Sequence, residues 1–313
     1  MARRPGAGEL SGRVSRRAGA PDCGWSTDLS FSESNVDHLG IRAPSRHGVR
    51  GAAGVDAGSY DPAMGERTSY APGTLSWTEL VTSDADAAKA FYTELFGWSY
   101  DDRPVGEGMV YSMAQVDGKS VAALYRADDR PHWNCYVTVE SCDATAARAA
   151  ELGGTVTGEP FDVMSAGRSA IVSDPSGAQF FLWEPGDNIG AYLVNTPGSM
   201  AWLDLVTPDP DTAERYYGEL FGWTFQALPN AGGYRIIRNG EQSNGGIFPL
   251  EGAPPAWIPY FGHEDLDAVL GRVDGLGAKV VTGPIPVPSG QFAVFADPQG
   301  AMFGVLSSNA YDD

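Results

Sequence analysis

The sequence predicts an α+β protein in which one domain is present as two tandem copies. Residues 75–100 align with residues 200–225 at an offset of 125, and 13 of the 26 aligned positions are identical. The run Glu-Leu-Phe-Gly-Trp occurs in both copies, at 94–98 and at 219–223. Similarity at one long, nearly constant spacing indicates duplication of a whole folding unit. The 40 Gly and 22 Pro residues among 313 favour a turn-rich β or α+β architecture.

Two further blocks of the sequence also repeat. Tyr136 matches Tyr260 at an offset of 124, and an Asp-Pro-x-Gly turn recurs at an offset of 123. Because the offset shrinks by only one residue at a time, the two copies are nearly free of gaps. We therefore assign residues 70–190 to the first domain and residues 191–313 to the second.

Residues 1–63 differ from the rest of the chain. They are dominated by Gly, Ala, Ser, Arg, Asp and Pro, and their apolar residues are isolated, with neither a helical nor a strand period. Such a segment cannot bury enough apolar surface to offset the entropy lost on ordering. We therefore expect residues 1–69 to be a disordered extension or an over-long gene start, the true start being Met64, and we assign them no function.

The first domain opens with a predicted strand at 75–82, followed by a helix. Asp84 or Asp86 can cap this helix, because a short acidic side chain accepts hydrogen bonds from the first free N–H groups. Gly97 ends the helix, since glycine readily adopts the left-handed conformation of helix C-caps. The apolar side chains recur with the spacing of one helix face: Ala88, Phe91, Tyr92, Leu95 and Phe96.

The remaining elements of the first domain follow the same order twice. Two strands are expected after the helix, and the second half then repeats strand, helix and strands. The Asp-Pro-Ser-Gly segment at 174–177 supplies a tight turn between the last two strands. The expected strands lie at 110–115, 120–125, 134–140, 168–173 and 179–184, and the second helix at 143–152.

This plan and its motifs resemble the vicinal oxygen chelate superfamily, which includes glyoxalase I, bleomycin-resistance proteins and extradiol dioxygenases. The resemblance covers about residues 70–308 and rests on the Glu-Leu-Phe-Gly-Trp runs and the Asp-Pro-x-Gly turns. It is strongest to the two-domain actinobacterial type. It implies that each domain consists of two βαβββ modules forming a curved mixed sheet around a cleft. Because this scaffold hosts unrelated chemistries, the resemblance specifies the fold more than the function.

The resemblance also implies where a metal ion would bind, on the first and last strands of the modules. None of the six side chains at these positions is a good ligand for a divalent transition metal. A register shift of two residues would bring in Glu79 or Asp204. We expect no metal and no other cofactor. The six positions hold Trp77, Asn134 and Phe181 in the first domain and Trp202, Ile258 and Gly304 in the second.

Alternation along the strands predicts which side chains face the two clefts. Glu79 and Asp204 are the candidate acid–base residues, one in each cleft. Apolar walls with a few polar groups are typical of small-molecule pockets, and the first cleft is richer in aromatic and amide groups. The candidate ligand-binding residues are Trp77, Asn134, Tyr136, Gln179, Phe181 and Trp183 in the first domain and Trp202, Tyr260 and His263 in the second.

Ordinary structural roles compete with these assignments. The aromatic residues could equally pack the two halves of each domain together. Glu79 and Asp204 could be solvated or salt-bridged at strand ends, whereas burial among aromatics would raise the pKa of either carboxyl and suit it to acid–base work. His263, followed by two acidic residues, is also typical of a surface histidine. The glycine pairs at 232–233 and 245–246 are typical of hairpin turns.

The charge balance bears on partners and location. The net charge of the chain is −19, and residues 64–313 alone carry −20. Such a body repels phosphate backbones, so neither nucleic acid nor an anionic membrane is an expected partner. The three cysteines form neither a zinc pattern nor an even-numbered disulfide framework, and no apolar run of membrane-spanning length occurs. We expect a cytoplasmic monomer whose tandem domains pair within the chain.

The function that these observations favour is binding of a small aromatic or hydrophobic metabolite without a metal, by sequestration or with acid–base catalysis. The sequence contains no Gly-x-Ser-x-Gly, P-loop, Rossmann or His-Glu-x-x-His motif, so the common hydrolase, nucleotide-binding and zinc-protease classes are not indicated. Two alternatives stay open. One is a metal-dependent lyase, isomerase or oxygenase, and the other is a degenerate, non-catalytic interaction protein.

Overall fold

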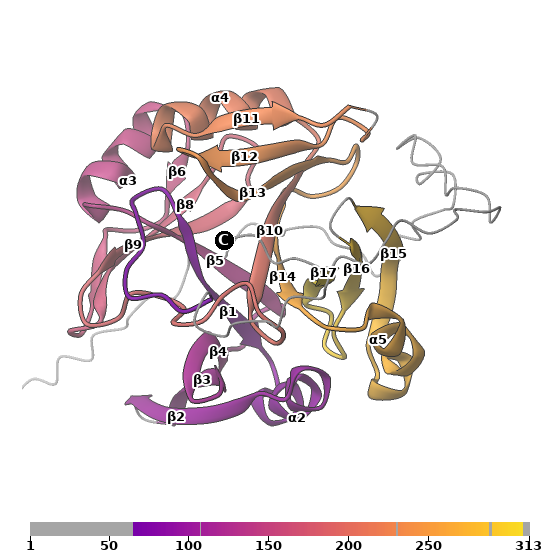
Figure 1. The fold of residues 1–313 in the computed structure, drawn as a ribbon. Helices are drawn as coiled ribbons and strands as arrows, with labels where there is room; N and C mark the ends of the chain where they lie inside the picture. The colour runs from indigo at the N-terminus through magenta and orange to yellow at the C-terminus, as the bar shows by residue number, and fades with distance from the viewer. Residues whose placement is uncertain (1–64, 107, 230, 288–289, 309–313) are drawn as a thin grey trace, which may run out of the picture.

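A computed structural model describes residues 65–106, 108–229, 231–287 and 290–308. These residues form two curved mixed sheets with a few helices, and the two sheets have the same strand order (Figure 1). The expected extension at 1–69 lies almost wholly outside the described residues. Within them, no helix is both long and apolar enough to span a membrane.

The first half of the first sheet is one strand–helix–strand module. Strand β1 has the bounds expected from the sequence, and helix α2 is capped by Asp84, whose side chain accepts from the N–H of Ala87. Gly97 closes the helix with φ of 72°, as predicted. The strand β2 was not predicted, because it is a mostly exposed edge strand without alternation. The elements are β1 (Leu75–Thr82), α2 (Ala85–Phe96), β2 (Ser99–Gly106), β3 (Met109–Val116) and β4 (Lys119–Arg126).

The second half of the first sheet repeats this plan. Its first strand, β5, begins and ends two residues earlier than the predicted strand at 134–140. The strand starts directly after Pro131 and stops where the chain turns towards Ser141, whose side chain caps α3. The elements are β5 (His132–Thr138), α3 (Cys142–Glu151), β6 (Thr155–Val156), β7 (Phe161–Val163), β8 (Gly167–Ser173) and β9 (Gln179–Pro185).

The second sheet is built in the same way. Its first strand, like that of the first sheet, lies between a parallel neighbour from its own module and an antiparallel neighbour from the next. The elements are β10 (Met200–Thr207), α4 (Pro210–Phe221), β11 (Thr224–Ala227), β12 (Arg235–Asn239), β13 (Gln242–Pro249), β14 (Ala256–Gly262), α5 (Leu266–Arg272), the short 3₁₀ helix η1 (Asp274–Leu276), β15 (Lys279–Val287), β16 (Gly290–Ala296) and β17 (Met302–Ser308).

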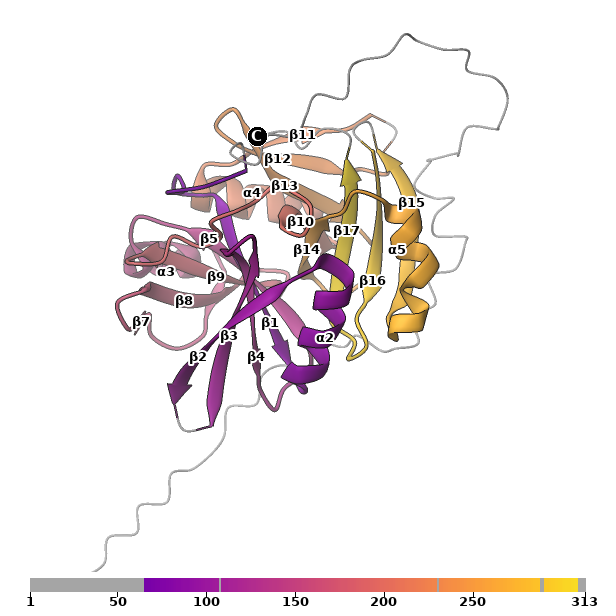
Figure 2. The ribbon, with the colours of Figure 1, turned by 60° about the horizontal axis from the view of Figure 1, so that its bottom comes forward.

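The helices of each half pack against the other half. Figure 2 shows α2 against β17 of the second sheet, and the rings of Phe91 and Phe303 meet there with centroids 6.0 Å apart. On the opposite side of the molecule, the ring centroids of Phe180 of β9 and Tyr217 of α4 are 5.5 Å apart. One apolar core therefore runs through both halves. The sheets are curved, and we call the face of each sheet that lies away from its helices the concave face.

The repeated sequence motifs build this shared core. The Tyr92 hydroxyl donates to Asp297 Oδ2, and the equivalent Tyr217 hydroxyl donates to Asp174 Oδ2, both at 3.1 Å. Each tyrosine belongs to a first helix and each aspartate to an Asp-Pro-x-Gly turn of the other half. Equivalent residues thus make reciprocal contacts, so the most conspicuous repeats in the sequence are structural.

Candidate functional site

The concave face of the first sheet holds a buried carboxyl group, that of Glu79 on β1. Only 6% of the Glu79 surface is exposed to solvent. The Tyr136 hydroxyl donates to Glu79 Oε1 at 2.6 Å, and the Tyr111 hydroxyl donates to Oε2 at 2.8 Å. The Asn134 amide also donates to Oε1, at 3.2 Å. Both carboxyl oxygens are therefore engaged, and the interpretation of Glu79 as a solvated or salt-bridged residue is wrong.

The register of the strands creates this cluster. Glu79 is paired with Asn134 on the antiparallel strand β5 and with Ala123 on the parallel strand β4. Cross-strand partners project from the same face of a sheet. Tyr111 of β3 then reaches the carboxyl from two strands away.

Burial raises the pKa of Glu79, and the three donated hydrogen bonds oppose that effect only in part. Burial and the nearby carboxylate also raise the pKa of Tyr111 and of Tyr136 well above the ordinary range. Both phenols therefore stay protonated and act as donors. A carboxyl whose pKa is raised by burial holds its proton more firmly than a carboxyl in water, which suits it to acid–base work.

Aromatic rings surround the carboxyl. The Trp77 indole N–H donates to the Tyr111 hydroxyl at 3.2 Å. The ring of Tyr136 lies 4.6 Å from that of Phe181 and meets Trp183 edge-on at 6.2 Å. Trp77, Tyr136, Phe181 and Trp183 are buried, and Tyr111 is partly buried. The structure thus brings five of the predicted first-domain residues together around Glu79, namely Trp77, Asn134, Tyr136, Phe181 and Trp183.

A histidine extends the cluster towards the end of the sheet. The Nε2 atom of His132 lies 3.1 Å from Asn134 Oδ1, and its Nδ1 atom lies 2.7 Å from the backbone oxygen of Arg130. The strand expected at 134–140 left His132 outside it, and this is wrong because β5 begins at His132. On β5, His132 is two residues from Asn134 and shares its face.

The second sheet contains the equivalent acidic residue, Asp204 of β10. The Tyr234 hydroxyl donates to Asp204 Oδ1 at 2.7 Å, and the Trp202 indole N–H donates to the same oxygen at 2.9 Å. Burial raises the pKa of Asp204 to about 6, against the hydrogen bonds from Tyr234 and Tyr260, which lower it. This carboxyl too is buried, so its interpretation as a surface group is wrong.

A glycine compensates for the shorter acid in the second sheet. The strand partner of Asp204 is Gly246, whereas that of Glu79 is Ala123. A Cβ atom on Gly246 would overlap the Tyr234 hydroxyl. Because aspartate is one methylene shorter than glutamate, Tyr234 must come closer to the sheet, and only glycine leaves room. The prediction of a hairpin turn at 245–246 is therefore wrong, since both glycines lie inside β13.

The surroundings of Asp204 are more apolar than those of Glu79. Ile258 stands where the first sheet has Asn134. Gly304 stands where the first sheet has Phe181, and the Tyr260 ring fills the space of a Cβ there. The second concave face is an apolar cluster of Val206, Ala253, Ile258, Tyr260 and Val294, with Trp202, Phe248, Leu250, Val281, Phe292, Met302 and Leu306 packed against it.

Two predicted site residues lie apart from these clusters, and two tyrosines were missed. Gln179 is exposed at the start of β9. His263 follows β14, and its Nδ1 atom accepts the N–H of Asp265 at the start of α5, on the helix side of the sheet. Tyr111 and Tyr234 were missed because the repeats that contain them have few identical positions. The shared spacing of 123 between these tyrosines is the signal that could have found them.

The donor atoms do not fit a transition-metal site. In the described part of the chain, no three His, Cys, Asp or Glu side chains come close enough together to hold a metal ion. Among the described residues of the hydrogen-bond network around Glu79, Glu79 and His132 are the ones that offer such donors, and both Glu79 oxygens already accept hydrogen bonds. The six positions that the resemblance marks for metal ligands hold two indoles, a phenyl ring, an amide, an aliphatic side chain and a glycine.

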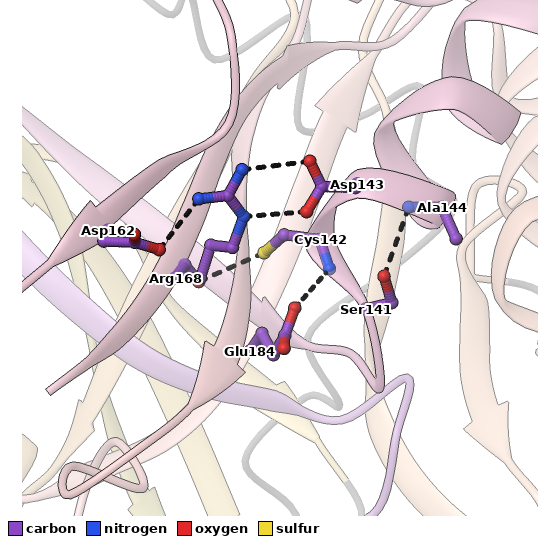
Figure 3. Close-up of polar contacts among 7 residues, drawn as sticks. All are labelled: Ser141, Cys142, Asp143, Ala144, Asp162, Arg168 and Glu184. Carbon is purple, nitrogen blue, oxygen red and sulfur yellow. Dashed lines mark hydrogen bonds and ion pairs between the residues drawn. The ribbon is translucent and has the colours of Figure 1, made fainter. Parts of the chain in front are cut away.

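A second polar cluster, at the N-terminus of α3, is structural (Figure 3). Arg168 pairs with Asp143 and Asp162, and Glu184 accepts the N–H of Cys142 at 2.9 Å. The Cys142 thiol donates to the backbone oxygen of Arg168, and burial raises its pKa to about 12. A thiol with so high a pKa is a poor nucleophile. Through these contacts, Arg168 of β8 and Glu184 of β9 hold the first turn of α3 against the sheet.

Comparison with known sequences identifies relatives along most of the chain. The family described as Glyoxalase/Bleomycin resistance protein/Dioxygenase superfamily matches residues 74–182. A protein named putative glyoxylase CFP32, from Mycobacterium bovis, is 41% identical over 255 residues, covering 78% of this chain and 98% of its own length. An anthracycline biosynthesis protein, DauV of Streptomyces sp. strain C5, is 32% identical over 273 residues, covering 76% of this chain and 94% of its own.

Solved structures share the fold at low sequence identity. A Mn(II)-bound glyoxalase from Novosphingobium aromaticivorans superposes with a TM-score of 0.54 at 16% identity, covering 77% of this chain and 86% of its own. The 2,3-dioxygenase LapB from Pseudomonas sp. KL28 gives a TM-score of 0.54 at 16% identity, with 75% and 93% covered. The chain belongs to the glyoxalase/bleomycin resistance protein/dioxygenase superfamily, also known as the vicinal oxygen chelate superfamily.

Proposed function

We propose that the chain binds a small aromatic metabolite on the concave face of the first sheet without using a metal ion. The observation that carries this proposal is the buried Glu79 carboxyl held by the Tyr111 and Tyr136 hydroxyls within aromatic walls. Flat apolar surface with a few fixed polar groups suits a planar ligand that bears hydroxyl or carbonyl groups.

The rings of the partly buried Tyr111 and Tyr125 stack with centroids 6.1 Å apart, and their remaining exposed surface would contact such a ligand. The protonated form of Glu79 could donate to a ligand carbonyl, and its carboxylate could accept from a ligand phenol. Sequestration needs only binding. Acid–base catalysis would in addition use Glu79 to move a proton on the bound ligand.

The names of the relatives agree with an aromatic ligand. Two proteins from Streptomyces that are 31–32% identical to this chain are named anthracycline biosynthesis proteins, and anthracyclines are polycyclic aromatic compounds. The alternative of a metal-dependent lyase, isomerase or oxygenase has support from the name glyoxylase and from the Mn(II)-bound glyoxalase fold. The donor set of the first concave face argues against it.

Fluorescence titration of the full-length protein with an anthracycline tests the proposal. We expect saturable binding, at least about tenfold weaker in E79Q, which corresponds to about 1.4 kcal/mol. The matched variant D204N should change the affinity less than twofold. Equal effects of the two variants would contradict the choice of the first sheet, and no binding to the wild-type protein would contradict the aromatic-ligand proposal.

Metal analysis and a thermal shift assay separate the alternatives. Stoichiometric, tightly held metal in the purified protein would favour the metal-dependent enzyme. A ligand that binds only the native state must raise the melting temperature, so a broad screen without any shift would favour a non-catalytic interaction protein. On charge balance and cysteine usage we also propose that the protein is cytoplasmic and monomeric. Sedimentation of the purified protein would check the monomeric state.

A further inference from the structure

Among the described residues, three tyrosines have hydroxyl groups close to Glu79, and two of these are directed at its carboxyl group. The Tyr136 hydroxyl donates to Oε1 at 2.6 Å, and the Tyr111 hydroxyl donates to Oε2 at 2.8 Å. The Tyr111 oxygen also accepts the Trp77 indole N–H. The hydrogens of these two hydroxyls are therefore used within the protein and are not available to a ligand.

The third tyrosine is Tyr125 of β4, and its hydroxyl is bonded differently. It lies two residues along β4 from Ala123, the strand partner of Glu79, so it projects from the same face of the sheet. A hydrogen bond with the Asn134 amide lowers the pKa of Tyr125, which makes the phenol oxygen the acceptor in that contact. In the described part of the chain, the Tyr125 O–H has no acceptor of its own.

The Tyr125 hydroxyl is also accessible and protonated. The residue is only partly buried, and its oxygen is not one of the enclosed, unpaired side-chain atoms of the described residues. Burial and, to a smaller extent, the charge of Glu79 raise the pKa of Tyr125 above the ordinary range, so the phenol keeps its hydrogen at neutral pH. An accessible O–H without an internal acceptor can donate to a bound molecule.

The second sheet has a phenyl ring without a hydroxyl at this position. Phe248 of β13 pairs with Val206 as Tyr125 pairs with Val81. The Phe248 ring meets that of Tyr234 edge-on, with centroids 6.2 Å apart. Because a phenyl ring alone satisfies the packing in the second sheet, the hydroxyl of Tyr125 is not required by the fold.

We propose that Tyr125 determines the specificity of the first concave face by donating a hydrogen bond to a carbonyl oxygen of the ligand. The ligand class is then a planar aromatic ketone or quinone. This inference rests on the proposed function, which places an aromatic ligand on the same face. A site with a fixed donor discriminates against analogues that lack the matching acceptor.

The surroundings of Tyr125 favour a carbonyl over a hydroxyl group on the ligand. A carbonyl oxygen needs only a donor, whereas a ligand hydroxyl brings a hydrogen that needs an acceptor of its own. The nearby oxygens of Glu79 already accept hydrogen bonds from Tyr111 and Tyr136. For the same reason, the ligand carbonyl is assigned to Tyr125 and not to Glu79.

A matched pair of ligands tests this assignment together with a variant that removes a single hydroxyl group. Fluorenone and fluorene are rigid, planar molecules of the same ring system, and only fluorenone has a carbonyl group. Binding of each to the full-length protein is measured by quenching of tryptophan fluorescence. Y125F carries the residue type of Phe248. We expect it to bind fluorenone about fivefold more weakly than the wild-type protein does, and to change the affinity for fluorene less than twofold.

The matched control variant is F248Y, which adds a hydroxyl at the equivalent position of the second sheet. It should change the affinity for either ligand less than twofold. A loss of fluorenone affinity in Y125F that is matched by an equal loss for fluorene would overturn the proposal. A change in F248Y as large as that in Y125F would overturn it as well.

Infrared spectroscopy of bound, isotopically labelled fluorenone gives a readout that does not depend on affinity. A donated hydrogen bond lowers the stretching frequency of a carbonyl group, so the band should lie at a higher frequency in Y125F than in the wild-type protein. An unmoved band would overturn the proposal. A band that moves in E79Q and not in Y125F would assign the donor to Glu79 and would overturn it too.

The same titrations distinguish a failure of this inference from a failure of the proposed function. If the wild-type protein binds both ligands and Y125F binds them equally well, the role of Tyr125 is refuted and the aromatic-ligand site is retained. If the wild-type protein binds neither ligand, the proposed function is refuted and the role of Tyr125 with it.

Discussion

Glu79 and Asp204 occupy equivalent positions on β1 and β10, and each is buried and held by a tyrosine hydroxyl from two strands away. Their surroundings differ. Each has two tyrosines near it, but Glu79 also has an amide and, through that amide, a histidine in its network, whereas the equivalent positions beside Asp204 hold Ile258 and Ala256. The carboxyl–tyrosine pair is therefore common to both halves, while the polar extension belongs to the first half alone. This difference teaches that duplication kept the scaffold and let the chemistry of the two faces diverge.

The strongest test of the shared scaffold uses two equivalent tryptophans. The Trp98 indole donates to the backbone oxygen of Gly198 at 2.6 Å, and the Trp223 indole donates to that of Gly73 at 2.8 Å. Both side chains are buried between the halves. We expect W98A and W223A each to lower the free energy of unfolding by about 3–5 kcal/mol, measured by urea denaturation. If the losses of unfolding free energy in W98A and W223A differ by more than a factor of two, the two equivalent tryptophans contribute unequally to the stability of the interface.

The pH dependence of stability sharpens the comparison at Asp204. Its folded pKa, about 6, lies above its ordinary value of 3.8, so this group favours folding most at low pH. That contribution is lost as the pH rises through 6, because the unfolded chain then releases the proton more readily. Between about pH 4 and pH 7 the wild-type protein should lose about 2–3 kcal/mol relative to D204N. If the free energies of unfolding of the wild-type protein and D204N change with pH in the same way, the pKa of Asp204 is not raised in the folded state.

The glycine opposite Asp204 provides the smallest expected effect. G246A places a Cβ against the Tyr234 hydroxyl and should cost about 1–3 kcal/mol, because Tyr234 must move away from Asp204. The matched variant A123G in the first sheet removes a methyl group without displacing Tyr111, and should cost about 1 kcal/mol or less. The measurement is the melting temperature together with a crystal structure of G246A. An unmoved Tyr234 in that structure would refute the compensation between the shorter acid and glycine.

Local rules were enough to predict much of the fold. The bounds of β1, a helix cap at Asp84 or Asp86 and the Gly97 terminus were predicted because caps and alternation depend on a few neighbouring residues, and the cap is Asp84. The edge strand β2 was missed because it lacks alternation. His132 was left outside its strand because the start of β5 depends on pairing with β1, which no local pattern contains.

The sequence by itself determined the duplication, the α+β class and the family, since repeats and short motifs can be read without coordinates. It also determined that Glu79 shares a face with Trp77, because alternation along a strand is a local property. Only the tertiary structure decided that Tyr111 and Tyr136 meet Glu79, that His132 joins through Asn134, and that the repeated motifs form the interface. These contacts join strands distant in sequence, and their register is set by packing of the whole sheet.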